Sequence, residues 1–200
     1  MALSKVQAAI IVMLGTLGQK VHRTRLVKLI YLADNTFYEL NGKTLTGLSY
    51  VWDSYGPNAI SNAIVKEADL LAHASLINMA VQPSIYGNDA HLYWTSEDRS
   101  SEALTQFSAG EIQVLRDTVK KYGAMSIRSI VGLSKKTRPF QQAKQYEILN
   151  LRLDPRANAL QQRVKANKQF MAVARRGIKD IALGRLTDQD ALDRLHKERA

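Results

Sequence analysis

The sequence predicts a mainly α-helical α+β fold: a helical domain with a small antiparallel β-sheet or hairpin, followed by a helical C-terminal arm. Three observations support this fold class. Between residues 24 and 41, apolar side chains recur at the 3.6-residue period of one helix face. Residues 49–52 form a short, aromatic, β-prone segment typical of a strand. Two further β-prone runs, 76–84 and 91–95, flank a Gly-Asn-Asp turn signal. The helical stripe consists of Leu26, Leu29, Ile30, Ala33 and Phe37.

In the first half of the chain, residues 3–17 have helical apolar spacing and predict a buried first helix, with Gly15 and Gly18 loosening its end. A second helix is predicted from about Val21 to the Asn41-Gly42 pair, because these two residues tolerate a left-handed backbone. After it, the Tyr55-Gly56-Pro57 turn forces a change of direction. Residues 58–72 predict a third helix, whose inward side chains are Ile60, Ile64, Leu70 and Leu71.

The two β-prone runs predict a hairpin, because the cluster between them favours a tight turn. An isolated two-stranded hairpin is only marginally stable in water. We therefore expect the hairpin to pair with the strand around Tyr50.

The second half of the domain begins with a helix start at Ser108, where Glu111 three residues later completes a capping box. This helix is expected to run to about Tyr122 and to stop at Gly123. Ser126 predicts the cap of a shorter helix, and Pro139 the start of another.

From residue 156 the chain becomes basic and keeps a helical apolar rhythm until Gly184, after which residues 187–190 predict the cap of a last short helix. We therefore divide the chain into a domain of residues 1–155 and a basic helical arm of residues 156–200. Whether the arm packs back on the domain or binds a partner is left open.

Composition excludes several classes of protein. The chain has 200 residues, 46% hydrophobic content and no cysteine, which excludes disulfides and thiolate catalysis and suits a reducing cytoplasm. The apolar run of residues 8–14 is too short to span a membrane. The net charge of +10 is unevenly distributed, since residues 118–146 hold seven basic side chains and no acidic one. Such segregation favours contact with an acidic partner.

No catalytic, cofactor-binding or metal site is expected. The four histidines, His22, His73, His91 and His196, lack the spacing of a metal motif. The segment 15–20 superficially resembles a phosphate-binding loop, but its glycines are too close together and no Ser or Thr follows Lys20. We therefore expect the protein not to be an enzyme.

Several motifs resemble those of the Panacea, or SocA-like, antitoxin domain family. They are Lys-Leu-Ile-Tyr-Leu-Ala-Asp at 28–34, Asn-Gly-Lys at 41–43, Leu-Thr-Gly-Leu-Ser-Tyr at 45–50, Tyr-Gly-Pro at 55–57 and Phe-Ser-Ala-Gly-Glu at 107–111. Arg138-Pro139-Phe140 stands where relatives tend to carry a Pro-aromatic pair. The residues that match the family's motifs, expected mainly to hold the fold, are Lys28, Tyr31, Ala33, Asp34, Gly42, Tyr50, Trp52, Tyr55, Gly56, Pro57 and Glu111.

The resemblance implies a prokaryotic or phage protein that neutralises a cognate toxin by protein–protein contact. Residues 175–195 are similar to the C-terminal arm of several antitoxins, in which two helices wrap the toxin. An amphipathic helix laid in a partner's groove would bury its apolar face, and its basic face would speed association with an acidic toxin. The candidate partner-binding residues are Arg175, Arg176, Ile178, Ile181, Arg185, Leu186, Leu192 and Leu195.

An alternative function is DNA-binding autoregulation, because a basic segment with interleaved aromatic residues can follow a phosphate backbone. The candidate nucleic-acid contacts are Lys120, Lys121, Arg128, Lys135, Lys136 and Arg138. No zinc finger or clear helix-turn-helix pattern accompanies them. Membrane contact is not expected, because the apolar face of the arm has few aromatic residues. Homo-oligomerisation is left open.

Overall fold

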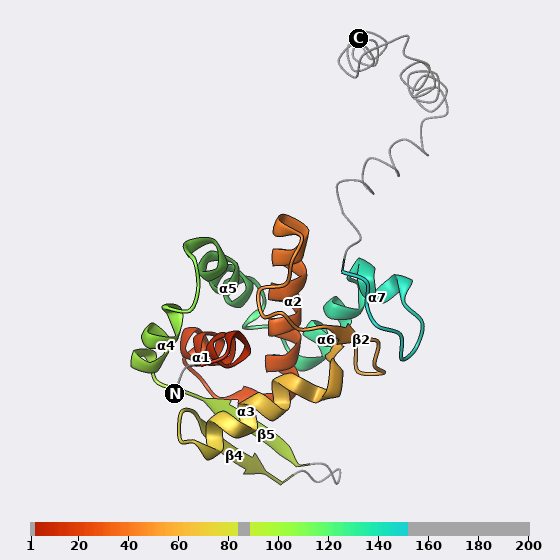
Figure 1. Ribbon diagram of the computed structural model, residues 1–200. Coiled ribbons are helices and arrows are strands. Elements are labelled where there is room, and N and C mark those ends of the chain that lie inside the picture. The colour runs from red at the N-terminus through yellow and green to blue at the C-terminus, as the bar shows by residue number, and fades with distance from the viewer. Residues whose placement is uncertain (1–2, 84–88, 152–200) are drawn as a thin grey trace, which may run out of the picture. The chain divides into compact units, whose positions relative to one another are not determined.

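The computed structural model describes residues 3–83 and 89–151 (Figure 1). These residues form a mainly helical α+β fold with small antiparallel sheets, so the predicted fold class is confirmed. The predicted arm, including all eight candidate partner-binding residues, lies outside the described residues.

The first two helices follow the sequence prediction closely. Helix α1, Lys5–Leu17, begins with a capping box in which Ser4 accepts from the Gln7 amide, and it ends at Gly18 with φ of 59°. Helix α2, Arg23–Asn41, ends at Gly42 with φ of 71°, the left-handed conformation expected there. Gly15 lies inside α1, not at a loosened end, because its missing side chain admits Ser100 from a later helix.

The hairpin is confirmed, but its predicted partner is wrong. Strands β4, Asn78–Gln82, and β5, Ala90–Trp94, pair antiparallel, with Ala80 opposite Leu92. The other edge of β5 pairs with β1, Val21–His22, two residues that were predicted to lie in the second helix. The sheet order is therefore β1-β5-β4. The strand around Tyr50 is not part of it.

That strand, β2, Tyr50–Val51, pairs instead with β3, Asn58–Ala59. The predicted helix of residues 58–72 is therefore shorter: a 3₁₀ turn, η1, spans Ile60–Asn62, and α3 spans Ala63–His73. Within this segment Ile64 and Leu71 are buried, as expected. Ile60 and Leu70 are exposed, which corrects their predicted inward placement. Ile60 lies in the 3₁₀ turn, and Leu70 is rotated by about 100° from the buried Leu71 on α3.

The remaining helices cover the second half of the domain. Helix α4, Glu97–Leu104, was not predicted, because its sequence is mostly polar. Helix α5, Ala109–Tyr122, has the predicted capping box of Ser108 and Glu111. Helix α6, Ile127–Lys135, is capped by Ser126 as expected, and α7, Arg138–Gln142, has Pro139 in its first turn.

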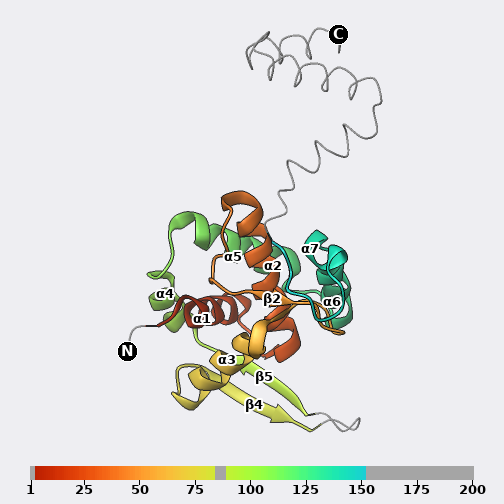
Figure 2. The same ribbon diagram turned by 45° about the vertical axis from the view of Figure 1, so that its right-hand side comes forward.

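Helix α2 lies at the centre of the described domain. Helices α1, α4 and α5 lie on one side of it and α6 and α7 on the other, as two views show (Figures 1 and 2). Its residues from Leu26 to Asn35 are all buried, including the polar Lys28, Asp34 and Asn35. Buried polar groups need hydrogen-bond partners. The partners of Lys28 and Asp34 lie in residues 46–57, the segment that follows α2.

Candidate functional site

The Tyr55-Gly56-Pro57 turn is bonded to helix α2 through Lys28. Lys28 is only 3% exposed, and its Nζ donates to the Pro57 carbonyl oxygen at 2.7 Å. Burial, opposed by nearby Asp53 and aided by Lys135, lowers the pKa of Lys28 to about 8. Because Lys28 Nζ bonds to the Pro57 carbonyl oxygen, it holds the backbone of the turn against α2.

Gly56 lets the same turn pack against helix α6. Its φ is 91°, a conformation that side-chain-bearing residues rarely adopt. An added Cβ would lie 2.9 Å from Ser134 Oγ and 3.5 Å from Lys28 Cε. No other residue type meets both requirements without strain, which explains the glycine of this motif.

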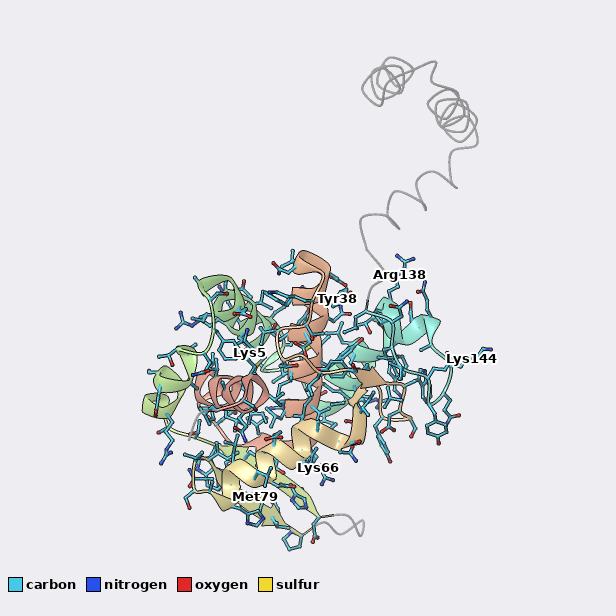
Figure 3. The ribbon with its side chains drawn as sticks, viewed as in Figure 1. Lys5, Tyr38, Lys66, Met79, Arg138 and Lys144 are labelled. Atoms are coloured by element: carbon cyan, nitrogen blue, oxygen red, sulfur yellow. The ribbon has the colours of Figure 1, made fainter. Side chains whose placement is uncertain are left out.

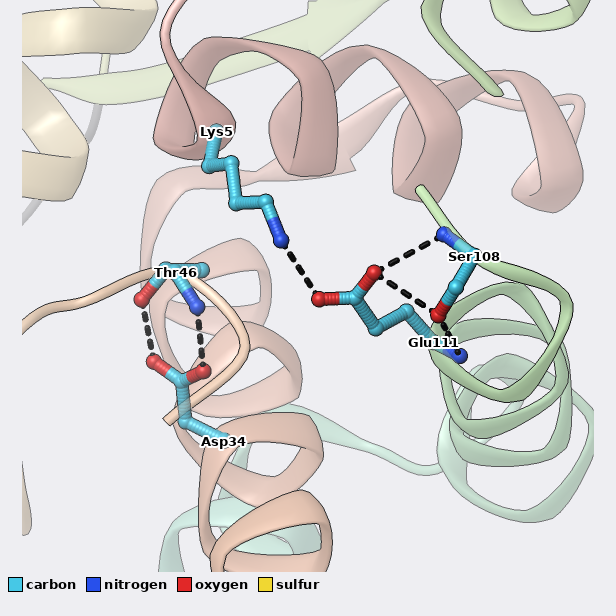
Figure 4. A network of polar contacts seen from close by, with 5 residues as sticks. All are labelled: Lys5, Asp34, Thr46, Ser108 and Glu111. Atoms are coloured by element: carbon cyan, nitrogen blue, oxygen red, sulfur yellow. Dashed lines mark hydrogen bonds and ion pairs between the residues drawn. The ribbon is translucent and has the colours of Figure 1, made fainter. Parts of the chain in front are cut away.

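A buried carboxylate joins helix α2 to the segment that precedes β2. Asp34 accepts from the Thr46 amide at 2.9 Å, from the Thr46 hydroxyl, and from Tyr50 Oη at 2.6 Å. The two bonds to Thr46 are visible in Figure 4. Burial raises the pKa of Asp34, although the hydrogen bonds from Thr46 and Tyr50 oppose the shift. This Asp34 cluster, Asp34 with Thr46 and Tyr50, fixes residues 45–50 on α2.

Aromatic contacts complete the support of β2. Tyr31 packs edge-on against Tyr50, with ring centroids 4.9 Å apart, and its hydroxyl shares a 2.6 Å hydrogen bond with Thr137 Oγ1. Trp52 stacks on Phe140 of α7 at 5.0 Å. The family-motif aromatic residues therefore connect α2, β2 and the start of α7.

A second carboxylate cluster lies between α1 and α5. Glu111 receives an ion pair from Lys5 Nζ at 2.5 Å and accepts from the Ser108 amide at 2.8 Å (Figure 4). Burial disfavours its ionised form, but the contacts with Lys5 and Ser108 outweigh burial and lower its pKa. We call Lys5, Ser108 and Glu111 the Glu111 cluster.

A polar cleft of about 650 Å³ opens beside the turn, between the start of α2 and β5. Its lining includes His22, Arg23, Lys28, Asp53 and His91. Burial lowers the pKa of His22, and Arg23, Arg25 and His91 add to the shift. Asp53 accepts from the Tyr55 amide and from Asn58 Nδ2, so its carboxylate organises the turn. Lys28 and Asp53 therefore support the backbone of the turn from this cleft.

Three exposed large side chains lie on the segments that flank β2. We define the β2 patch as Tyr55, Tyr146 and Ile148, which are 74%, 74% and 66% exposed. The backbone holds two of these residues on β2, since the Tyr146 amide donates to the Trp52 carbonyl at 3.2 Å and Ile148 bridges to Val51. Tyr146 has φ of 66°, rare for a bulky residue and often a mark of a functional position.

The predicted nucleic-acid contacts are spread over three successive helices. Lys120, Lys121, Arg128 and Lys136 are exposed, whereas Arg138 is partly buried. Lys135 is also partly buried and donates to the Ser54 carbonyl at 2.5 Å, which ties α6 to the turn. Figure 3 places Arg138 and Lys144 on the same side of the domain as α7.

Two further family-motif residues, Ala33 and Gly42, contribute to the packing and the end of α2. Ala33 is buried in α2, and Gly42 ends that helix. Sequence reasoning missed four partners of the motif residues, namely Lys5, Thr46, Ser134 and Thr137. Thr46 lies inside a motif that was recognised, but nothing in its local pattern indicated a bond to Asp34.

Among the residues that the structure describes, no group of three or more His, Cys, Asp or Glu side chains is placed to hold a metal ion. Within the same residues no helix combines the length and apolar character needed to cross a membrane.

The fold is a mainly helical α+β domain built around one buried helix, α2, whose polar side chains Lys28 and Asp34 bond to the segment that follows it. The family model for the antitoxin SocA-like, Panacea domain matches residues 26–141. The chain belongs to this family, as its motifs predicted. It has no significant match among curated proteins or among solved structures.

Proposed function

We propose that this protein is an antitoxin that neutralises a cognate toxin protein by binding it directly. The observation that carries this proposal is the match of residues 26–141 to a family described as SocA-like antitoxins. A toxin and its antitoxin meet in the cytoplasm, where we place the protein.

We propose the β2 patch as the contact surface that the domain contributes. Tyrosine is enriched at the energetic centre of protein interfaces, because it buries a large rigid ring and keeps a polar tip. Tyr55 and Tyr146 leave most of that area uncovered on the domain. Lys135 Nζ contacts the Ser54 carbonyl next to Tyr55, and exposed Lys144 precedes Tyr146 by two residues. Exposed Glu147 lies between Tyr146 and Ile148, so the charge around the patch is mixed.

We propose the arm residues as the second contact, with the patch and the arm engaging the toxin together. Two linked contacts give a tighter complex than either alone, because the second binds at a high effective concentration. The arm begins eight residues after Ile148 in the sequence. The proposed set is Arg175, Arg176, Ile178, Ile181, Arg185, Leu186, Leu192 and Leu195.

The test is co-expression of the full chain with the product of the neighbouring reading frame. Growth rescue and co-purification are expected for the unmodified chain. Tyr146→Ala is expected to weaken binding by at least tenfold, which corresponds to about 1.4 kcal/mol. Leu40→Ala is the matched control, because Leu40 is 62% exposed at the far end of α2 and should leave binding unchanged.

Two results would contradict the proposal in different ways. If the unmodified chain fails to bind or protect against the neighbouring product, the antitoxin function is wrong for this pair. If the chain protects but Tyr146→Ala and Leu40→Ala behave alike, the patch is wrong and the arm remains. Ile181→Asp then tests the arm directly.

DNA-binding autoregulation is the second candidate, favoured by the exposed cations of α5 and α6 and the absence of acidic residues from 118 to 146. Protection of the DNA upstream of the protein's own gene would support it. Lys120→Glu with Lys121→Glu should then reduce binding and its salt dependence, because phosphate contacts release counterions. Equal binding to unrelated DNA would argue against a specific operator.

A further inference from the structure

Strand β4 is an edge strand of the β1-β5-β4 sheet. It has β5 on one side, and no strand of the described residues pairs with its other side. Figures 1 and 2 both show it as the outermost strand, next to α3. Four of its five residues, all but Ala80, are exposed. An exposed edge offers unpaired backbone N–H and C=O groups to any extended chain.

Natural proteins usually block such an edge with charged side chains, proline or a bulge. The strand β4, Asn-Met-Ala-Val-Gln, has none of these, and Pro83 follows only after the strand ends. Residues 70–88 contain no Lys, Arg, Asp or Glu, although 23% of the chain is charged. Met79 and Val81 are exposed by 36% and 48%. The edge is therefore uncharged, partly apolar and open to pairing.

The strand is also complementary to itself. An antiparallel pair of two copies centred on Ala80 places Met79 opposite Val81 of the second copy and Asn78 opposite its Gln82. Apolar residues then meet apolar residues, and amides meet amides, at the positions where cross-strand pairs interact. In a two-fold interface one patch must complement itself, and the order of residues in β4 satisfies this condition. The lack of charge also avoids repulsion across the axis.

We propose that two copies of this chain associate through β4, forming a continuous six-stranded sheet across a two-fold axis. Met79 lies opposite Tyr93 in the β4–β5 register, and Val81 lies two residues further along β4, so both side chains are on the same face of the sheet as the Tyr93 side chain. The Tyr93 hydroxyl donates to Asp69 of α3. Because the paired segment is short, the dimer is expected to be weak and concentration-dependent.

Sedimentation velocity of the full chain over a series of concentrations tests the association. A monomer–dimer equilibrium is expected for the unmodified protein. Val81→Lys should shift it to monomer, since a charged edge residue opposes pairing and Val81 is already exposed enough to be replaced without loss of fold. Leu40→Lys carries the same charge change at an exposed position near the C-terminal end of α2 and should leave the equilibrium unchanged. A monomer at every concentration, or equal effects of the two variants, overturns the proposal.

A cysteine placed at the axis tests the register independently. The chain has no native cysteine, so Ala80→Cys introduces a single reactive thiol. In the proposed pairing two such residues face each other at about 5 Å between Cβ atoms, so a short bismaleimide should join the copies efficiently. Ser129→Cys, on the exposed face of α6, is the control and should give little crosslinking. Equal crosslinking at both positions contradicts the register.

Discussion

The Asp34 cluster and the Glu111 cluster solve the same problem, a carboxylate placed within the fold, in opposite ways. Asp34 is fully buried and receives only uncharged donors, from Thr46 and Tyr50. Glu111 is 7% exposed and receives a cation as well as a helix-cap donor. The pKa of Asp34 is raised and that of Glu111 is lowered. Burial dominates where no cation is present, and a charged partner at the edge of the core reverses it.

The difference also concerns what each cluster connects. The donors of Asp34 come from residues 46 and 50, far from it along the chain but adjacent in space, so the cluster fixes the segment that leads into β2 and the Tyr55-Gly56-Pro57 turn. Glu111 mainly caps the N-terminus of α5, the helix in which it lies, and adds one ion pair to Lys5 of α1. We therefore expect a much larger stability loss when the Asp34 cluster is broken.

Replacing Asp34 with alanine should have the largest effect. Three donors, the Thr46 amide, the Thr46 hydroxyl and the Tyr50 hydroxyl, would lose their acceptor in a buried site. We expect a loss of about 3 to 5 kcal/mol in the free energy of unfolding, measured by urea denaturation. Asp69→Ala is the control, because Asp69 accepts from Tyr93 in a partly buried site and should lose about 1 kcal/mol. Equal losses would contradict the assigned role.

Removing one donor from the same cluster should have an intermediate effect. Tyr50→Phe deletes the 2.6 Å bond to Asp34 and keeps the ring that packs on Tyr31. A loss of about 1 to 2 kcal/mol is expected, since bonds to charged groups are the stronger ones. Tyr31→Phe deletes a bond to the neutral Thr137 hydroxyl and should cost less. If Tyr50→Phe does not lose more stability than Tyr31→Phe, the bond to the Asp34 carboxylate is no stronger than the bond to the Thr137 hydroxyl.

Changes at Glu111 should be milder. Glu111→Ala removes both the cap and the ion pair and is expected to lower the free energy of unfolding by about 1 kcal/mol. Glu111→Gln keeps an acceptor for Ser108 and should cost only about 0.3 kcal/mol, because Lys5 is 46% exposed and its ion pair is screened by solvent. Thermal denaturation of both variants measures the difference. A loss for the glutamine variant close to that of the alanine variant would show that the ion pair outweighs the cap.

The smallest effect expected is a pair of opposite pH trends. The pKa of Glu111 is lower in the folded state than its ordinary value of 4.5, so its stabilisation is present above about pH 4.5 and is lost as the pH falls through the folded value. The pKa of Asp34 is raised above 3.8, so the unfolded state ionises first and stability decreases as the pH rises from 3.8 towards the folded value.

The stability difference between the unmodified chain and Glu111→Gln should therefore shrink as the pH falls. The difference from Asp34→Asn should instead grow as the pH falls. Melting temperatures of the three proteins, measured between about pH 3 and pH 7, test both signs. Parallel trends for the two variants would refute the contrast between the clusters.

Local signals in the sequence predicted the helices with distinct caps and stripes. Helices α1, α2 and α5 have the predicted positions because capping boxes, left-handed stops and apolar periods act within a few residues. Helix α4 escaped prediction, because its mostly polar residues gave no apolar period. The motif residues were found by resemblance to a family, and their physical roles were not legible from the sequence.

Strand pairing was the main error. The hairpin was expected to meet β2, but it meets the two residues before α2, and β2 meets Asn58–Ala59. A two-residue strand is too short to show the alternation of apolar and polar residues that identifies a strand. Its pairing depends on how α2 and α3 position the segments next to them. The exposure of Ile60 is part of the same error, because a strand and a 3₁₀ turn replace the start of the predicted helix.

The helical character of the domain, the position of its caps and turns, and its family motifs could be predicted, because they depend on residues that are neighbours in the chain. The bond from Lys28 to Pro57, the bonds of Asp34 with Thr46 and Tyr50, and the exposure of Tyr55 and Tyr146 became known only from the folded domain. Each of these contacts joins segments whose approach depends on packing the whole core, and burial then sets which polar groups must find a partner.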